Sequence, residues 1–294
     1  MKTSITVFTP TYNRKEKLAV LYESLCRQTD KDCVWYIVDD GSTDETGKRV
    51  EEWMQEEILS IRYEYQRNGG KHRAHNRGVQ ACDTEWFLCV DSDDFLDNRA
   101  IEIIKKKVEM VTAADIGLIF PKYESQDGYH GPWFPDGSHI HMCSIKMTFG
   151  RIVEAALVIR TECLKRHLCR EVEGENFLSE EILHNALMEE GTFVTCKEKI
   201  YIFKYLADGL TSQVFQLWKK NPKGAILMLL SRYEVIQRSE MPLLKKWKQS
   251  IMCIMNLNAL CMATGRKITE VSPNIKLSVL LSAPSVFFKK KRFG

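Results

Sequence analysis

Residues 85–96, "EWFLCVDSDDFL", run from an apolar stretch straight into a cluster of acids. Residues 86–90 have the length and composition of a buried strand. Asp91, Asp93 and Asp94 follow at once, although carboxylates repel one another and are costly to bury without a partner. Two explanations are open: the acids cap the next helix, or they bind a positively charged group.

The first half of the chain alternates between strand-like and helix-like patterns. This order predicts an α/β fold with a parallel sheet and crossover helices, and such sheets bind ligands beyond the carboxyl ends of their strands. Strands are predicted at residues 5–8, 33–40, 60–66 and 85–91, helices at residues 14–26 and 42–55, and a loop that enters a helix at residues 69–82. Ser42, with Glu45 three residues later, is a capping-box signature that predicts the start of the second helix, and either Ser42 or Asp44 is expected to cap it.

Three of the predicted strands end in polar residues: "TPTYN" at 9–13, "DDGS" at 39–42 and "DSDD" at 91–94. The carboxyl ends of parallel strands share one edge of a sheet, so these three loops are predicted to meet. Asp91 and Asp93 offer the oxygen ligands that Mg²⁺ and Mn²⁺ prefer, and such an ion also binds phosphate oxygens. The sequence alone leaves this metal site and a plain helix cap as alternatives.

The stretch "NGGKH" at residues 68–72 combines two glycines with a lysine. The glycines allow close approach of the backbone to a ligand, and Lys71 would offset phosphate charge. The spacing is not that of a P-loop, and the chain contains no G-x-G-x-x-G, which argues against a dinucleotide-binding site.

The second half of the chain becomes mostly helical. A helix at residues 101–111, strands at 116–120, 155–160 and 199–206, a helix at 180–189 and an irregular segment at 125–150 are predicted. Residues 211–263 have a helical pattern, which places a domain boundary near residue 215. We therefore predict an α/β domain at 1–215 and a C-terminal helical region at 216–294.

Composition and charge limit the function classes. The net charge of +3 over 294 residues does not indicate a nucleic-acid-binding protein. The 10 cysteines form no C-x-x-C pair, and no signal peptide opens the chain, so we expect reduced thiols and a cytoplasmic location. No apolar run has the length of a membrane-spanning helix. The basic end, residues 289–292, follows two phenylalanines and is interpreted either as a solvated tail or as a peripheral contact with anionic lipid.

Four motifs now carry a resemblance. "ITVFTPTYNR", "YIVDDGSTDET", "NGGKHRAHNRG" and "LCVDSDDFL", in this order, resemble those of the family 2 glycosyltransferases over about residues 3–215. The resemblance implies the GT-A fold, which has a Rossmann-like, mostly parallel central sheet flanked by helices, here with a C-terminal helical extension. It also implies an inverting, metal-dependent hexosyltransferase whose nucleotide-sugar donor is a UDP-sugar.

The resemblance assigns the donor site residue by residue. Tyr12 would stack on the base, Asp39 would accept the uracil N–H, and Asp91 with Asp93 would hold the diphosphate through Mn²⁺ or Mg²⁺. His75 stands where many members have an arginine, so Lys71 or Arg77 would be the cation beside the diphosphate. The full set of donor-binding candidates is Thr9, Pro10, Tyr12, Arg14, Asp39, Asp40, Asn68, Gly69, Lys71, His75, Arg77, Asp91 and Ser92.

The general base is implied by an acidic pair at the start of a helix. Inverting transfer needs a carboxylate that takes the proton of the acceptor hydroxyl. In "ENFLSEEIL" the pair is Glu180 and Glu181, and both stay open as the base. Residues 208–211 match a loop that closes near the acceptor in related enzymes.

The resemblance implies a β-linked product, made on a glycan or a lipid-linked acceptor during surface polysaccharide synthesis at the inner face of the plasma membrane. Two alternatives come from other classes. A sugar-nucleotide nucleotidyltransferase would carry a glycine-rich loop near its N-terminus, but "TPTYNR" has no glycine. A non-catalytic nucleotide-sugar-binding protein would need neither the acid pair Asp91 and Asp93, which with Ser92 forms a D-x-D motif, nor the glutamate pair.

Overall fold

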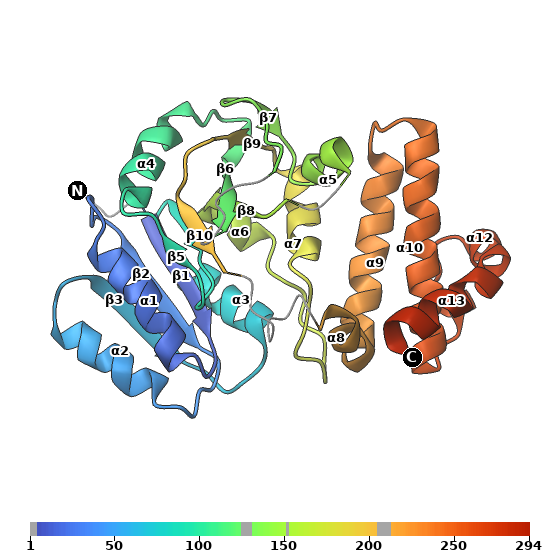
Figure 1. The fold of residues 1–294 in the computed structure, drawn as a ribbon, viewed down its shortest axis with the longest axis horizontal. Helices are drawn as coiled ribbons and strands as arrows, with labels where there is room; N and C mark the ends of the chain where they lie inside the picture. Colours follow the sequence, from blue (N-terminus) through green and yellow to red (C-terminus); the bar gives the residue numbers. More distant parts are fainter. Residues whose placement is uncertain (1–4, 125–130, 151–152, 205–212) are drawn as a thin grey trace. The chain divides into compact units, whose positions relative to one another are not determined.

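The computed structural model describes residues 5–124, 131–150, 153–204 and 213–294 (Figure 1). The chain divides into two compact units. The first unit comprises residues 1–169 and 186–205, and the second comprises residues 170–185 and 206–294. The domains predicted at 1–215 and 216–294 stay a prediction.

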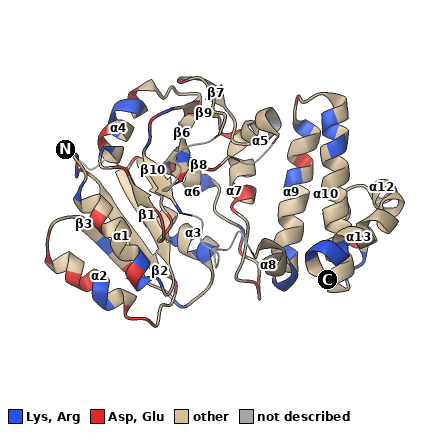
Figure 2. Ribbon diagram, in the orientation of Figure 1, with Lys and Arg blue, Asp and Glu red and all other residues tan. Residues whose placement is uncertain are grey.

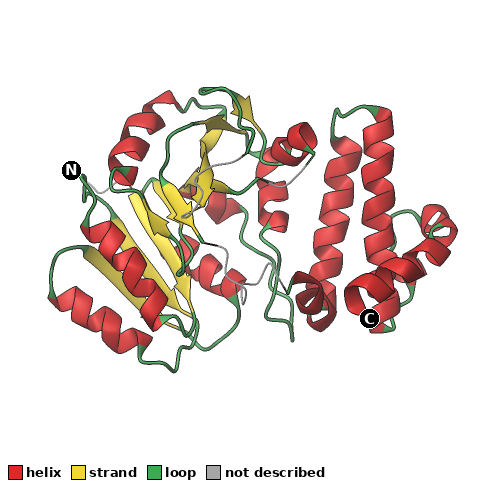
Figure 3. Ribbon diagram, viewed as in Figure 1, coloured by secondary structure: helices red, strands yellow, loops and turns green. Residues whose placement is uncertain are grey.

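The first unit is built on a mixed sheet in the order β3-β2-β1-β4-β8-β6-β10-β5. Neighbours among the first four strands pair in parallel, whereas β8 is antiparallel to both β4 and β6, and β10 is parallel to β6. The strands are β1 (Ile5–Thr11), β2 (Val34–Asp39), β3 (Ser60–Tyr65), β4 (Trp86–Cys89), β5 (Phe95–Leu96), β6 (Asp115–Glu124), β7 (His139–Ile140), β8 (Ala155–Arg160), β9 (Thr192–Thr195) and β10 (Tyr201–Phe203). The predicted central sheet, mostly parallel and flanked by helices, is confirmed (Figure 3).

Helices cover both faces of this sheet. Alternate residues of a strand point to opposite faces. Trp35 of β2 stacks near Tyr22 and Trp53 on one face, while Phe8 of β1 packs edge-on against His75 on the other. The helices of the first unit are α1 (Lys15–Cys26), α2 (Thr46–Gln55), α3 (Lys71–Ala81), α4 (Ala100–Lys107), α5 (Ser144–Phe149) and α6 (Thr161–Arg166).

The contact between α3 and β1 depends on Gly78. A Cβ atom at this position would lie 2.1 Å from the ring of Phe8, well inside van der Waals contact. The absence of a side chain therefore lets α3 lie directly on β1, which brings the start of α3 to the edge of the sheet where β1 ends.

The start of α2 differs from the predicted capping box. The helix begins at Thr46, and Asp44, not Ser42, accepts the N–H and the hydroxyl of Thr46. The Ser42 hydroxyl instead accepts the N–H of Asn13, at 2.8 Å. Of the two predicted caps, Asp44 therefore bonds the start of the helix, whereas Ser42 ties the loop after β2 to the loop after β1.

The second unit is helical. It contains α7 (Glu181–Ala186), whose last residue belongs to the first unit, and α8 (Val214–Lys220), α9 (Pro222–Arg238), α10 (Leu243–Thr264), α11 (Ile268–Val271), α12 (Ile275–Leu280) and α13 (Ser282–Phe293). Its core is formed by Trp218, Met228, Leu229, Leu257 and Leu260, and Phe293 at the end of α13 is buried in it. Among the described residues, no helix is long and apolar enough to cross a bilayer.

Candidate active site

The loops after β1, β2 and β4 meet at one edge of the sheet, as predicted. β2, β1 and β4 are neighbours in parallel, with Thr11 opposite Asp39 and Phe8 opposite Cys89. The N–H of Val90 continues this pairing by donating to the carbonyl of Phe8 at 2.8 Å. The acids that follow β2 and β4 therefore lie on either side of the loop that follows β1.

Asp39 is buried at the end of β2, with a side chain held in one orientation. One carboxylate oxygen accepts the N–H of Ser42 at 2.7 Å, and the other accepts the hydroxyl of Tyr63 at 2.9 Å. Burial, followed by this hydrogen bond to Asp39, raises the pKa of Tyr63, so the tyrosine stays a donor. Each carboxylate oxygen still has lone-pair capacity, which leaves Asp39 able to accept an N–H from a ligand.

Asp40 organises the glycine-containing loop that precedes α3. Its carboxylate accepts the backbone N–H groups of Gly69 and Gly70 at 2.8 and 2.7 Å, while the side chain of Asn68 donates to the Asp40 carbonyl at 2.9 Å. Gly41 has a φ of +91°, and a Cβ there would lie 2.7 Å from the nitrogen of Asn68. Asp40 is thus a positioning residue that shapes this loop from within.

The loop after β1 separates buried residues from exposed ones. Thr9 and Pro10 are buried, and the Thr9 hydroxyl accepts the indole N–H of Trp35 at 3.0 Å. Tyr12 is 48% exposed, which leaves its ring available to stack on a ligand. Arg14 is half-buried directly before α1.

Asp91 and Asp93 lie in different surroundings, although only Ser92, which is buried, separates them. The ammonium group of Lys71 lies 2.5 Å from one carboxylate oxygen of Asp91, and that of Lys122 lies 4.0 Å from the other. The side chain of Asp93 is half-buried and makes no hydrogen bond or ion pair with any described residue. One acid of the D-x-D is therefore already neutralised by lysine, and the other is available.

Tyr201 and Asp94 support Asp91 from the interior. The Tyr201 hydroxyl accepts the N–H of Asp91 at 3.0 Å and donates to Asp94 at 2.8 Å. The ammonium group of Lys122 lies 3.9 Å from the centre of the Tyr201 ring and 3.8 Å from Asp94. Burial raises the pKa of Asp94 to about 7, against the opposing effect of Lys122. Asp94 is not a helix cap, because β5 and not a helix follows it.

Sequence reasoning missed Lys122 and Tyr201. Lys122 is a charged residue at the end of the apolar run of β6, and Tyr201 pairs with it in the parallel strand β10. A charged residue after a buried strand is the same kind of signal as Asp91, so Lys122 had a detectable pattern. Tyr201 had none, because a tyrosine in an apolar strand is usually a core residue.

The donor chemistry of Asp91 and Asp93 fits a divalent cation. Both offer carboxylate oxygens, which Mg²⁺ and Mn²⁺ prefer. The ammonium of Lys71 already binds one oxygen of Asp91 as a cation would, and Asp93 has free ligand capacity. Asp91 and Asp93 are therefore the residues that would hold the metal.

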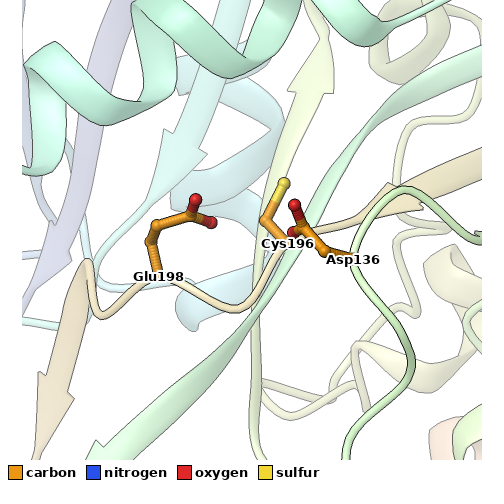
Figure 4. Close-up of side chains that lie close together, drawn as sticks. All are labelled: Asp136, Cys196 and Glu198. Carbon is orange, nitrogen blue, oxygen red and sulfur yellow. The ribbon is translucent and has the colours of Figure 1, made fainter.

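A second group of metal-type side chains has a different character. Asp136, Cys196 and Glu198 lie close enough to share an ion (Figure 4). However, the ammonium of Lys107 lies 2.9 Å from Asp136 and 2.6 Å from Glu198. Burial raises the pKa of Cys196 to about 12, which keeps its thiol protonated and unsuited to bind a metal. These four residues, here named the Lys107 cluster, form an ion-pair site.

Lys71 and Arg77, which the sequence left as alternatives for the cation beside the diphosphate, have different partners. Lys71 binds Asp91, as described, whereas Arg77 donates to Glu64 at 2.7 Å on the adjacent strand β3. Burial opposes ionisation of Glu64, but the hydrogen bonds from Arg77 and Arg62 help to outweigh it, and the pKa of Glu64 is lowered to about 2. The geometry thus favours Lys71 as the cation near the D-x-D.

His75 occupies an apolar position. Its ring lies edge-on to Phe8 and Phe87, with centroid distances of 5.8 and 5.6 Å. It is half-buried on α3. These ring contacts place it in the packing between α3 and the sheet.

Glu180 and Glu181 belong to the second unit, where their surroundings differ. Arg232 of α9 holds both oxygens of Glu181, at 2.6 and 2.5 Å, and Ser179 accepts the backbone N–H of Glu181. Glu180 is exposed. The predicted loop at residues 208–211 lies outside the described residues.

Known proteins of one family resemble this chain. Glycosyltransferase GlyG of Streptococcus pneumoniae serotype 4 is 24% identical over 237 residues, which cover 75% of this chain and 77% of GlyG. The poly(ribitol-phosphate) beta-N-acetylglucosaminyltransferase TarS of Staphylococcus aureus strain Mu50 is 32% identical over 106 residues. These residues are 35% of this chain but only 18% of TarS, and the match to glycosyltransferase GlyA of S. pneumoniae also spans 18% of that protein.

Solved structures show the same fold. The crystal structure of S. aureus TarS 1-349 in complex with UDP-GlcNAc matches with a TM-score of 0.60 at 14% identity, over 99% of this chain and 91% of that one. Mannosyltransferase PcManGT from Pyrobaculum calidifontis, in complex with GDP-Man and Mn²⁺, matches with a TM-score of 0.58 at 14% identity, over 99% and 84%. The predicted GT-A fold is confirmed. The model of Glycosyl transferase family 2 matches residues 6–168, more than half of the sequence, and the chain therefore belongs to that family.

Proposed function

We propose that this protein is an inverting hexosyltransferase that moves a sugar from a UDP-sugar to a hydroxyl of a glycan or lipid-linked acceptor in surface polysaccharide synthesis. One observation carries the proposal: the Lys71–Asp91 ion pair lies beside an available Asp93 at the carboxyl end of β4. A nucleoside diphosphate with a bound cation suits such a site. Its phosphates carry negative charge for the lysine, and its cation carries positive charge for the carboxylates. The TarS structures with UDP and UDP-GlcNAc support a uridine donor.

In this proposal the loops after the strands bind the nucleotide. Tyr12 stacks on the base, and the fixed carboxylate of Asp39 accepts the ring N–H of uracil. Asp40 acts indirectly by holding Asn68 and Gly69 in place. The D-x-D, with Lys71, faces the diphosphate.

Asp91 and Asp93 would hold Mn²⁺ or Mg²⁺. When bound, the cation would neutralise charge on the departing nucleoside diphosphate. PcManGT contains Mn²⁺ with its donor, which supports this class of ion. Lys71 contributes a further positive charge from the protein itself, and Lys122 and Tyr201 keep Asp91 in position.

We assign the general base to Glu181, with Glu180 as the alternative. The base takes the proton of the acceptor hydroxyl, the oxygen bonds to the anomeric carbon, and the electrons of the broken C–O bond leave with the diphosphate. Attack from the face opposite the leaving group inverts the configuration. Two hydrogen bonds from Arg232 fix the direction of the Glu181 carboxylate.

The donor is tested by thermal shift with a panel of UDP- and GDP-sugars in the presence of Mn²⁺, since a ligand that binds the folded state raises its stability. A stabilisation by UDP-sugars alone is expected, and stabilisation by GDP-sugars alone would contradict the uridine assignment. Transfer is then followed with the stabilising donor and glycan or lipid-linked acceptors.

Two matched variants test the base. Glu181→Gln should lower kcat on the order of 100-fold while UDP affinity persists, and Glu180→Gln should have a much smaller effect. The reverse order would move the base to Glu180. Unchanged kcat in both variants would place it elsewhere.

Contact of the C-terminal tail with a membrane is a further part of the proposal. Within α13, Phe287 is 66% exposed, whereas Arg292 packs over the rings of Phe215 and Phe288. Deletion of residues 285–294 would also remove the buried Phe293. Substitution of Lys289, Lys290 and Lys291 by glutamine is therefore the better test, and unchanged vesicle binding would contradict the contact.

A further inference from the structure

The first two turns of α10 expose large apolar side chains. Leu243 is 84% exposed, Leu244 is 82% exposed and Trp247 is 62% exposed. With 3.6 residues per turn, these three positions fall on one side of the helix, and Ile251 continues the stripe one turn later. We name Leu243, Leu244 and Trp247 the α10 apolar face.

Lysines surround this face. Lys245, Lys246 and Lys248 alternate with its members in "LLKKWK", and by helical spacing Lys246 and Lys248 lie on its two sides. Lys245 and Lys248 are exposed, and Lys246 bonds the carbonyl of Gln237 at 2.9 Å. An apolar stripe bordered by lysines, with a tryptophan in it, is typical of a helix that lies in the interface of a membrane.

The charge of the surrounding helices has the same sign. Residues 213–294 carry 15 lysines and arginines but only three acids, although the whole chain has a net charge of +3. Figure 2 shows basic residues on α9, α10 and α13, with few acids between them. The acid nearest to the α10 apolar face in sequence is Glu240, in the turn before the helix.

We infer that the α10 apolar face docks on a bilayer that contains anionic lipid. The leucines and the indole enter the interface, and the flanking lysines lie at the level of the head groups. A second copy of the chain is a poorer occupant, because two such faces would bring like-charged lysines together. This contact is distinct from the one proposed for the tail, because the α10 apolar face belongs to α10 and the tail belongs to α13.

Sedimentation with vesicles tests the inference. The full chain should bind vesicles of phosphatidylcholine with about one-third phosphatidylglycerol at least tenfold better than vesicles of phosphatidylcholine alone, and added salt should weaken this binding. Leu244→Glu/Trp247→Glu should lower the affinity at least tenfold. Because both side chains are mostly exposed, the variant is expected to fold, which its thermal unfolding checks.

Two controls make the test specific. Ile58→Glu changes a 44% exposed apolar residue of the first unit and should leave vesicle binding unchanged. Gln substitution of Lys245, Lys246 and Lys248 should remove the preference for anionic lipid. Vesicle binding is measured without sugar donor, so its failure and a failure of transfer are distinguishable.

Equal binding of the folded Leu244→Glu/Trp247→Glu variant and the unchanged protein would overturn the inference. The inference would also be overturned if the unchanged protein formed an oligomer, did not bind vesicles, and was dissociated by these two substitutions. A second copy of the chain would then be the occupant of the face. Binding to an acidic protein without any binding to anionic vesicles would also overturn it.

Discussion

Two groups of acids in the first unit look alike in composition but differ in what they can bind. Asp91, Asp93 and Asp94 follow β4, and the Lys107 cluster gathers Asp136 and Glu198 around one ammonium group. Lys107 is nearly enclosed, with a side chain 14% exposed, and it pairs with both acids, although the other oxygen of Glu198 is buried without a hydrogen-bond partner among the described residues. In the first group Asp93 keeps its ligand capacity.

A short distance between possible ligand atoms does not by itself define a metal site. The three ligand atoms of Asp136, Cys196 and Glu198 all lie within 4.8 Å of one another, yet a lysine already supplies their positive charge. The D-x-D lies where three parallel strands end, and there a ligand with both phosphate and metal has access. The shared lysine and the difference in access thus separate the two groups.

Removal of the Asp93 carboxylate is expected to have the strongest consequence. Asp93→Asn should lower transfer on the order of 100-fold and should weaken Mn²⁺ binding, because it removes an anionic ligand. Isothermal titration with Mn²⁺ and UDP, together with a transfer assay, measures both effects. The matched variant Asp136→Asn should change neither, and a loss of Mn²⁺ affinity in that variant would reverse the roles of the two groups.

Asp115 is a buried acid outside both groups, and its contribution to stability depends on pH. Burial opposes ionisation of Asp115, but hydrogen bonds from Thr192, His139 and Thr112 outweigh it and lower the pKa from 3.8 to about 2. Since the folded-state pKa is lowered, the stabilisation is fully present above about pH 4 and is lost as the pH falls toward 2. Its size is about 2 kcal/mol.

Urea unfolding between pH 5 and pH 2 measures this contribution. Asp115→Asn should be less stable at pH 5 and should show a flatter decline in the free energy of unfolding than the unchanged protein. Parallel declines in the two proteins would show that other acids account for the loss.

Lys71 gives the next test, at the site proposed for the diphosphate. Lys71→Met removes the ammonium beside Asp91 and should weaken UDP binding about tenfold, the size expected for one charge-assisted contact. Arg77→Met should leave UDP affinity unchanged, because Arg77 is bound to Glu64. A larger loss in the arginine variant would make Arg77 the cation that the sequence left as an alternative.

The sequence predicted the first half of the fold because its signals are local. The apolar run of β2 ends in Asp39, and the helical spacing of residues 14–26 became α1 within one residue. Parallel order then followed from the alternation of strands and helices. The sequence could not decide between Ser42 and Asp44 as the cap, because the partner of Ser42, Asn13, is 29 residues away and a capping box considers only neighbours in sequence.

The site could be predicted only in part for the same reason. Residue types indicated Asp91 and Asp93, but the partners of Asp91 come from α3, β6 and β10, which lie far apart in the sequence. Likewise, no residue near Glu181 in the sequence indicates that it binds Arg232, which lies 51 residues later. The assignment of residues to donor, metal and base therefore stays a prediction, with these contacts as its physical support.

The smallest expected effect concerns Lys107. Lys107→Met leaves Asp136 and Glu198 without their shared cation, and because both acids are partly exposed, water and salt limit the loss of stability to about 1 kcal/mol. Donor binding and transfer should not change. Chemical unfolding measures the loss of stability, and a titration with Mn²⁺ examines the freed acids.

If the Lys107→Met variant gained Mn²⁺ affinity comparable to that of the D-x-D, the lysine alone would be what separates the two groups. If it gained none, the protonated thiol of Cys196 and the missing phosphate partner would also be required for the difference.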